Sequence, residues 1–156
     1  LFPFHVFFAK ETAIMRDLHN ALYPKRAIAP AAAVTDNTAF VSQILDMSGY
    51  SAAELIMQIG ALADADTTFT VLIEHGDVSN LSDAAAVPDS MLLGTEVLAA
   101  FQFDDDNECR KIGYIGDKRY VRATITPANN TGNIFLAATW LLGAPRDSTS
   151  VVNPPA

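Results

Sequence analysis

Cysteine is nearly absent from this chain of 156 residues, which contains only Cys109. A single cysteine forms no internal disulfide, and it cannot supply the Cys-x-x-Cys pair of a zinc or redox site. We expect Cys109 to be a small, partly buried apolar side chain. Stability must therefore come from packing. A chain of this length with 50% hydrophobic residues is large enough to bury a core in one domain.

The sequence also lacks the motifs that carry catalytic chemistry. It contains neither of the glycine-rich patterns that cradle phosphates, and it has no Gly-x-Ser-x-Gly nucleophile elbow. The histidines are His5, His19 and His75. His75 is predicted to be a loop residue, because a general base needs a positioned nucleophile and none is evident. These absences predict a protein that is not an enzyme and holds no cofactor.

The strongest candidate for a metal site is the acidic run Asp104–Glu108, in which alternate carboxylates could offer oxygens to calcium. The run departs from an EF-hand loop, because its sixth position is Cys109 instead of glycine and its twelfth is Ile115 instead of glutamate. A solvated turn that ends a strand is the favoured interpretation. We therefore predict no metal, and calcium binding at this run is the alternative.

Positive charge is missing from a long stretch: no Lys or Arg stands between Arg26 and Arg110, where fourteen Asp and Glu lie. The net charge of −8 argues against a nucleic-acid partner, since phosphate binding needs net or clustered positive charge. Basic residues then cluster. They are either a solvated face or a patch that guides docking between subunits. The candidate subunit-contact residues are Arg110, Lys111, Lys118, Arg119 and Arg122.

The N-terminal segment 1–14 begins with the apolar run Leu1–Ala9, which is shorter than the about 20 residues that span a membrane. It also lacks the basic region and cleavage site of a signal peptide, so we expect no membrane partner. The codons of Lys10 and Glu11 can form a purine-rich ribosome-binding site shortly before Met15. The favoured hypothesis is that residues 1–14 are leader and the native start is Met15. The alternative is a short interaction arm.

Hydrophobic alternation predicts short β-strands separated by turn residues. Residues 63–66 are short enough to join two of these strands as a hairpin, and Gly116-Asp117 is expected to form a tight hairpin turn in which glycine adopts a positive φ. Residues 75–92 are expected to form a long loop. The expected strands are residues 38–45, 53–62, 67–74, 97–103, 110–115, 118–126 and 134–142.

Seven or eight short strands without βαβ units predict an all-β domain over residues 38–145, an antiparallel β-sandwich of jelly-roll or immunoglobulin-like kind. Residues 15–37 are expected to form an extended N-terminal arm, in which Pro30 permits only an edge strand or a bulge. Residues 146–156 are expected to be a loose or partner-bound tail.

Several short motifs are typical of one family. Residues 111–122 read Lys-Ile-Gly-Tyr-Ile-Gly-Asp-Lys-Arg-Tyr-Val-Arg, and a Thr-Pro turn follows at 126–132. Upstream stand Asp36-Asn37-Thr38-Ala39, Gly49-Tyr50 and Leu92-Leu93-Gly94-Thr95-Glu96. Through these motifs the chain, from about Met15 to Pro145, resembles small structural proteins encoded in the head-gene clusters of tailed phages and prophages, similar to capsid decoration or cement proteins.

This resemblance implies a virion protein of the phage head, present in the host cytoplasm during assembly. Its partners would be the major capsid protein or other virion subunits, with a homo-oligomer expected and no catalytic residues. The rival hypothesis is a β-sandwich binding module for a carbohydrate or receptor on a tail or spike. A sugar-binding face would present exposed aromatics near amides and carboxylates. Here the aromatics alternate as core positions, which favours the structural role.

Overall fold

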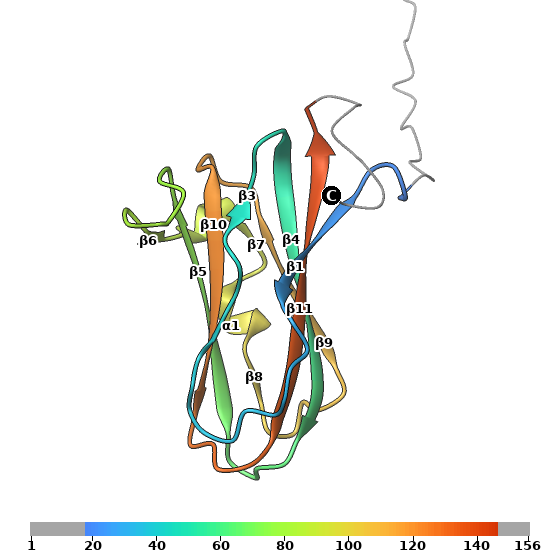
Figure 1. Cartoon of the computed structure of the whole chain (residues 1–156), viewed down its shortest axis with the longest axis vertical. Helices are drawn as coiled ribbons and strands as arrows, with labels where there is room; N and C mark the ends of the chain where they lie inside the picture. Colours follow the sequence, from blue (N-terminus) through green and yellow to red (C-terminus); the bar gives the residue numbers. More distant parts are fainter. Residues whose placement is uncertain (1–17, 147–156) are drawn as a thin grey trace, which may run out of the picture.

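The structure is a computed structural model that describes residues 18–146. Two layers of long antiparallel strands run along the long axis of the molecule (Figure 1). The predicted all-β antiparallel sandwich is therefore confirmed. The expectations for segment 1–14, for the start at Met15 and for the tail beyond Arg146 fall outside the described residues.

The first layer, sheet A, contains five strands, and every pairing in it is antiparallel. Its central strands are the longest of the chain, and β1 forms one edge. Pro24 lies in this edge strand, where a missing N–H is tolerated. The spatial order is β1 (Tyr23–Ile28), β11 (Ile134–Pro145), β4 (Tyr50–Leu62), β9 (Cys109–Tyr114) and β7 (Leu92–Leu93).

The second layer, sheet B, is built around two long strands that pair along nine residues. Two short strands, β2 and β3, line the outer side of β10, and two others, β6 and β8, line the outer side of β5. The spatial order is β2 (Phe40–Val41) with β3 (Leu45–Asp46), then β10 (Tyr120–Ala128), β5 (Thr68–Gly76), and β6 (Ala85–Ala86) with β8 (Phe101–Gln102).

The core lies between the two sheets and is filled by alternate residues of each strand. Along β10, Val121, Ala123 and Ile125 are fully buried while the residues between them are half-exposed, as the alternation predicts. Trp140 and Tyr114 are the largest buried side chains. Burial of so much apolar area supplies the main stabilising free energy.

Both expected hairpins are wrong, because each pair of strands belongs to different sheets. Residues 110–115 and 118–126 become β9 in sheet A and β10 in sheet B. The Tyr114 hydroxyl accepts the Lys118 N–H at 3.1 Å inside the connection. A Cβ at Gly116 would lie 2.5 Å from the Tyr114 ring, so glycine is needed there for close approach, and its φ is not positive.

The connection from β4 to β5 crosses between the sheets in the same way. The end of β4 continues to contact the start of β11, because Ala63 N–H bonds to the Asn133 carbonyl at 3.1 Å. Asp64 accepts the Thr131 backbone N–H at 2.6 Å and its hydroxyl at 2.9 Å. These bonds hold the chain on sheet A until Thr67, after which β5 begins in sheet B.

Three further expectations need correction. Residues 97–103 do not form one strand, because Thr95 caps a short helix, α1 (Glu96–Ala99), by accepting the Leu98 N–H at 3.1 Å. The region 38–45 is broken into β2 and β3. Cys109 is exposed instead of partly buried, because it lies on the outer side of β9.

The segment expected to be a long loop is partly regular. Between His75 and Leu92 it forms β6 and the 3-10 helix η1 (Asp89–Met91), which leads into β7. On this side of the sandwich α1 lies against β5, and the Glu96 carboxylate accepts the Ile73 N–H at 2.6 Å. Within residues 18–146 no helix is long and apolar enough to cross a membrane.

Candidate functional site

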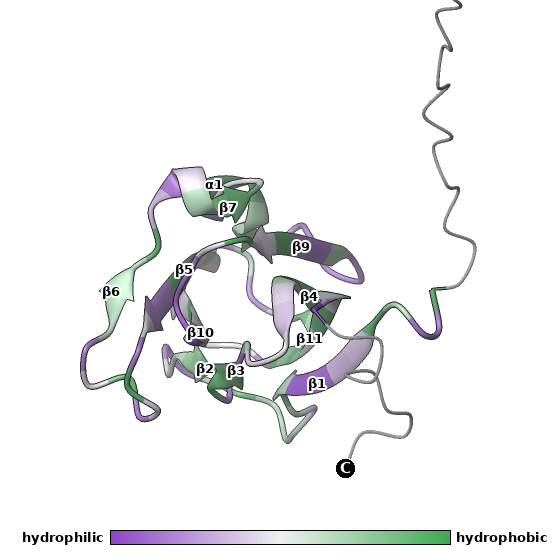
Figure 2. Cartoon of the chain, turned by 90° about the horizontal axis from the view of Figure 1, so that it is seen from above, coloured by the Kyte–Doolittle hydropathy of each residue, from purple (hydrophilic) through white to green (hydrophobic). Residues whose placement is uncertain are grey.

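A cleft opens where the edge of sheet A meets the edge of sheet B. Strand β1 forms one wall, and the segment that carries β2 and β3 forms the other; the view from above shows β1 beside β3 (Figure 2). The Gln43 backbone N–H donates to the Ala27 carbonyl at 2.9 Å, so the two edges are tied together at one end. Beyond that bond the walls separate.

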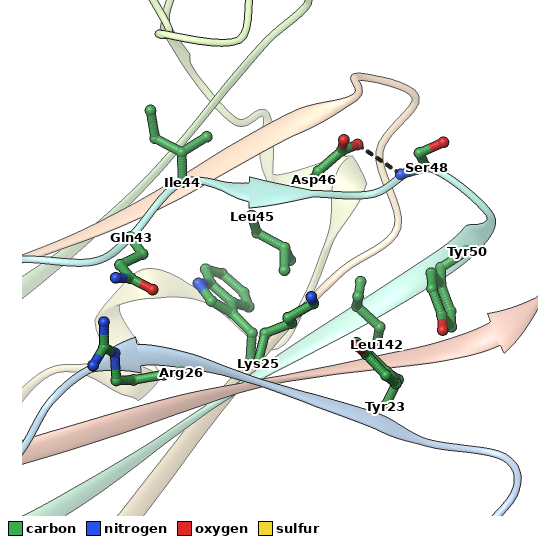
Figure 3. A pocket seen from close by; sticks show the side chains of 11 residues that line it. Tyr23, Lys25, Arg26, Gln43, Ile44, Leu45, Asp46, Ser48, Tyr50 and Leu142 are labelled. Carbon is green, nitrogen blue, oxygen red and sulfur yellow. Dashed lines mark hydrogen bonds between the residues drawn. The ribbon is translucent and has the colours of Figure 1, made fainter. Parts of the chain in front are cut away.

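The cleft has a volume of about 470 Å³, within the range of small-molecule sites. Its walls come from three parts of the chain that are distant in sequence, and its side chains are shown in close-up in Figure 3. The lining residues are Tyr23, Lys25, Arg26, Gln43, Ile44, Leu45, Asp46, Ser48, Tyr50, Trp140 and Leu142.

The apolar part of the cleft is aromatic. The rings of Tyr23 and Tyr50 are stacked, with centroids 6.0 Å apart, and burial raises the pKa of Tyr50. Trp140 is only 1% exposed, and its indole Nε1 has no hydrogen-bond partner among the described residues. A buried donor without an acceptor is uncommon and costs free energy.

The polar part of the cleft offers both donors and acceptors. Asp46 is held by Arg119 through two bonds of 3.0 and 2.9 Å, and this pairing lowers the pKa of Asp46. The same carboxylate accepts the Ser48 N–H at 2.9 Å. On the opposite wall the Lys25 ammonium lies 4.8 Å from the centroid of the Tyr23 ring. Gln43 adds an amide to the same rim.

The five candidate subunit-contact residues are each engaged in an ion pair inside the chain. Arg110 pairs with Asp105 at 2.7 Å and with Glu108 at 2.9 Å. The other four pair as follows: Lys111 with Glu54 at 3.9 Å, Lys118 with Asp77 at 2.6 Å, Arg119 with Asp46 at 2.9 Å, and Arg122 with Glu74 at 2.7 Å. Their charges are thus balanced locally, and docking through them stays a prediction.

These basic residues are also spread over both sheets. Arg110 and Lys111 lie on β9 in sheet A, and Arg122 lies on β10 in sheet B. Lys118 and Arg119 lie in the connection between these strands. The cluster in the sequence therefore becomes a band that passes from one layer to the other.

Local hydrogen bonds and ion pairs engage most carboxylates of the acidic run Asp104–Glu108. Asp105 accepts the Gln102 N–H at 2.9 Å in addition to its bond with Arg110, and Asp106 accepts from the Asn107 amide at 3.0 Å. Among residues 18–146 no group of three or more potential ligands gathers as a metal site needs. Three carboxylates of the run, those of Asp105, Asp106 and Glu108, bond to neighbouring residues.

His75 was expected in a loop and instead lies buried on β5. Its Nδ1 is 3.0 Å from the Tyr114 hydroxyl. Burial lowers the pKa of His75 and raises the pKa of Tyr114. The neutral imidazole is therefore part of the core and bonds to the tyrosine that organises the connection from β9 to β10.

Comparison with known proteins is limited to the fold. No protein-family model and no curated protein matches the chain. The chain is similar to the CBM22-1 xylan-binding domain of Paenibacillus barcinonensis Xyn10C, with 11% identity, a TM-score of 0.42, and coverage of 80% of this chain and 83% of that one. A likeness of this degree carries no argument about function.

A second similar structure contains the CBM22-1 and GH10 modules of Clostridium thermocellum endo-1,4-beta-D-xylanase 10B, complexed with xylohexaose. Here the identity is 9% and the TM-score is 0.39, and the match covers 88% of this chain but only 28% of that one. None of these comparisons bears on the resemblance to phage head proteins, which stays a prediction.

Sequence reasoning did not find the cleft. Its walls join residues 23–26, 43–50 and 140–142, and nothing in their local spacing marks them as a site. The one available signal was the pair Lys25-Arg26, which are the last basic residues before the long stretch without positive charge.

Proposed function

We propose that this chain is a β-sandwich binding module whose cleft between β1 and the segment 43–48 holds a carbohydrate. One observation carries the proposal: Trp140 lines the cleft, and its buried indole N–H has no acceptor within the described residues. Aromatic side chains and a polar rim surround it. Convergence of apolar walls with a few polar groups is the general character of a ligand site.

The composition of the cleft suits a sugar. A sugar ring has C–H faces that pack on aromatic and aliphatic surfaces, and hydroxyls that both donate and accept hydrogen bonds. Tyr23, Tyr50 and Leu142 offer the first kind of surface. Gln43 and Ser48 offer groups that can both donate and accept.

An added peptide strand suits the cleft less well. Pairing with a sheet edge depends on a row of free backbone donors and acceptors. Pro24 removes a donor from the β1 edge, and the Ala27 carbonyl is already bonded to Gln43. Side chains, more than backbone groups, therefore remain to recognise a ligand here.

The experiment uses Trp140 as the reporter, because it is the only tryptophan in the chain. The full chain is titrated with a panel of defined hexasaccharides, neutral and acidic, while tryptophan emission is recorded and affinity is measured by calorimetry. We expect at least one saccharide to shift the emission with a Kd below about 1 mM, which corresponds to about 4 kcal/mol of binding free energy.

Matched glutamine variants locate the site. Gln43→Ala should weaken binding about fivefold, because a hydrogen bond contributes about 1 kcal/mol. Gln58→Ala removes the same group from the outer face of sheet A, away from the cleft, and should leave affinity unchanged. A panel without any binder, or equal loss in both variants, would refute the proposal.

The second candidate function is packing against other virion subunits, as decoration or stabilisation of a capsid. It is favoured by an apolar groove of about 360 Å³ on the outer face of sheet A. Leu93 is 54% exposed beside this groove, and burial raises the pKa of Glu54 within it. Exposed apolar surface of this kind often marks a protein contact. The groove is lined by Leu22, Ala52, Ala53, Glu54, Ile56, Leu93, Lys111, Leu141 and Gly143.

Light scattering after size exclusion tests this candidate. An oligomer at micromolar concentration that Leu93→Asp dissociates would support subunit packing through this face. A monomer at every concentration, identical in the variant, would count against a homo-oligomer formed through sheet A.

A further inference from the structure

We infer that the ligand of the cleft is an acidic saccharide, one that carries a carboxylate or a sulfate on a sugar ring. This inference rests on the proposed function and names its ligand class. The evidence is the distribution of positive charge over the described residues, because two of the three cations that make no ion pair with a described residue line the cleft.

Residues 18–146 contain eight Lys and Arg, and five of them are the ion-paired residues 110, 111, 118, 119 and 122. Arg146 bonds to the Ser51 hydroxyl at 3.4 Å. Arg146, Lys25 and Arg26 make no ion pair with a described residue. Two of these three cations, Lys25 and Arg26, lie on β1. Both line the cleft.

The carboxylate inside the cleft does not cancel these charges. Asp46 is engaged by Arg119 through both of its oxygens, and Lys25 acts on it more weakly and through space. Arg119, which does not line the cleft, balances the charge of Asp46, so Lys25 and Arg26 leave the cleft with two positive charges in excess. In a chain whose net charge is −8, this local excess would concentrate an anionic ligand at the cleft.

The two cations stand on the same wall. Adjacent residues of a regular strand point to opposite faces, yet Lys25 and Arg26 both line the cleft. The pairing of β1 with β11 shifts register directly after Arg26, so the strand departs from regular geometry there. Figure 3 shows both side chains on the β1 side of the cleft, across from Gln43, Ile44 and Leu45.

The chemistry of the wall matches one anionic group on a sugar. The Arg26 guanidinium can bond a carboxylate or sulfate through two parallel N–H groups, and the Lys25 ammonium adds a point charge. The Tyr23 ring beneath Lys25 keeps a sugar face in reach of the ammonium. Charge-assisted bonds of this kind should favour an acidic over a neutral saccharide by about ten- to a hundredfold.

The test measures the affinity of the full chain for three probes: an oligogalacturonate hexamer, a sulfated hexasaccharide, and a neutral hexasaccharide of similar length. Each is titrated by calorimetry and tryptophan emission at 20 and 300 mM NaCl. We expect at least one acidic probe to bind tenfold or more tightly than the neutral one, with affinity that falls as salt rises. Comparison of the affinities of the oligogalacturonate and the sulfated probe decides whether the cleft prefers a carboxylate or a sulfate.

Charge variants assign the effect to the cleft. Lys25→Gln and Arg26→Gln should each remove most of the preference for the acidic probe and most of its salt dependence. Lys111→Gln removes a charge of the same sign from outside the cleft and should change neither. Equal affinity for acidic and neutral probes, or a preference unaffected by the two cleft variants, would overturn the inference.

The outcomes separate this inference from the proposed function. If the neutral probe binds as well as the acidic probes and Gln43→Ala still weakens binding, the carbohydrate site stands and its acidic specificity falls. If no probe binds, both fall. If inorganic sulfate alone displaces the acidic probe at equal concentration, the cleft recognises a free anion, and the proposal of a saccharide ligand is overturned.

Discussion

Replacement of Asn130 by alanine should destabilise the fold more than any other single change of a polar side chain in the described residues. Asn130 is only 4% exposed and follows β10. Its amide nitrogen donates to the Asp36 carbonyl at 3.0 Å and the Gly132 carbonyl at 2.9 Å. Its amide oxygen accepts the Thr67 hydroxyl at 3.2 Å and the Gly132 N–H at 3.4 Å.

The magnitude follows from these four bonds. Each contributes about 0.5–1.5 kcal/mol net, and the buried Thr67 hydroxyl would lose the acceptor that Asn130 supplies. We therefore expect Asn130→Ala to lower the free energy of unfolding by about 2–4 kcal/mol. With a urea m-value of about 2 kcal/mol/M, the denaturation midpoint should fall by about 1–2 M.

The assay is urea denaturation followed by circular dichroism and Trp140 emission, with Asn80→Ala as the control. Asn80 lies in an exposed loop, where its side chain accepts the Ser82 N–H at 3.0 Å. The control should lower the midpoint by less than about 0.5 M, in line with the loss of one exposed bond. A shift for Asn130→Ala no larger than that of the control would refute the argument that this side chain joins distant segments.

Three other predictions test particular contacts. Burial lowers the pKa of His75, so below about pH 6.5 the unfolded chain binds a proton at His75 more readily than the folded chain does. The free energy of unfolding should therefore fall from about pH 7.5 to 5.5. His75→Gln should reduce that slope, and an unchanged slope would contradict the role given to His75. Gly132→Ala places a Cβ 2.9 Å from the Asp64 nitrogen and 3.1 Å from the Ala63 carbonyl carbon, both of which are backbone atoms. The substitution should lower the free energy of unfolding by about 1–3 kcal/mol in urea denaturation. An unaltered midpoint would show that the backbone moves to accommodate the Cβ at no cost. The exposed Cys109 thiol should react with a disulfide reagent in the native protein nearly as fast as in urea, and protection of more than about a hundredfold would place it in the interior.

The alternation of apolar residues was enough to predict the fold class. Side chains two apart on a strand share a face, so a local pattern such as Val121, Ala123, Ile125 identifies both a strand and its buried side. Where a local bond competed with that pattern, the prediction failed. Thr95 caps α1, and the apolar residues that followed it became a helical turn instead of a strand.

The partners of each strand could not be predicted from spacing. A short connection allows a hairpin within one sheet and equally a crossing between two, and the choice depends on contacts with distant residues. Tyr114 fills the crossing before β10, and Asp64 bonds to Thr131 across the crossing before β5. Asp36 and Asn130 belong to two motifs that are ninety-four residues apart, yet they are bonded to each other.

The sequence by itself determined an all-β chain without disulfides, because strand periodicity and cysteine number are local or countable properties. Only the tertiary structure decided which charges are free. Each basic residue that clusters in the sequence pairs with a carboxylate, which for four of the five comes from a remote segment of the chain. Lys25 and Arg26 instead stand opposite Gln43 and Asp46 in a cleft. Ion pairing and cleft formation depend on distances between remote segments, and the folded sheets alone set those distances.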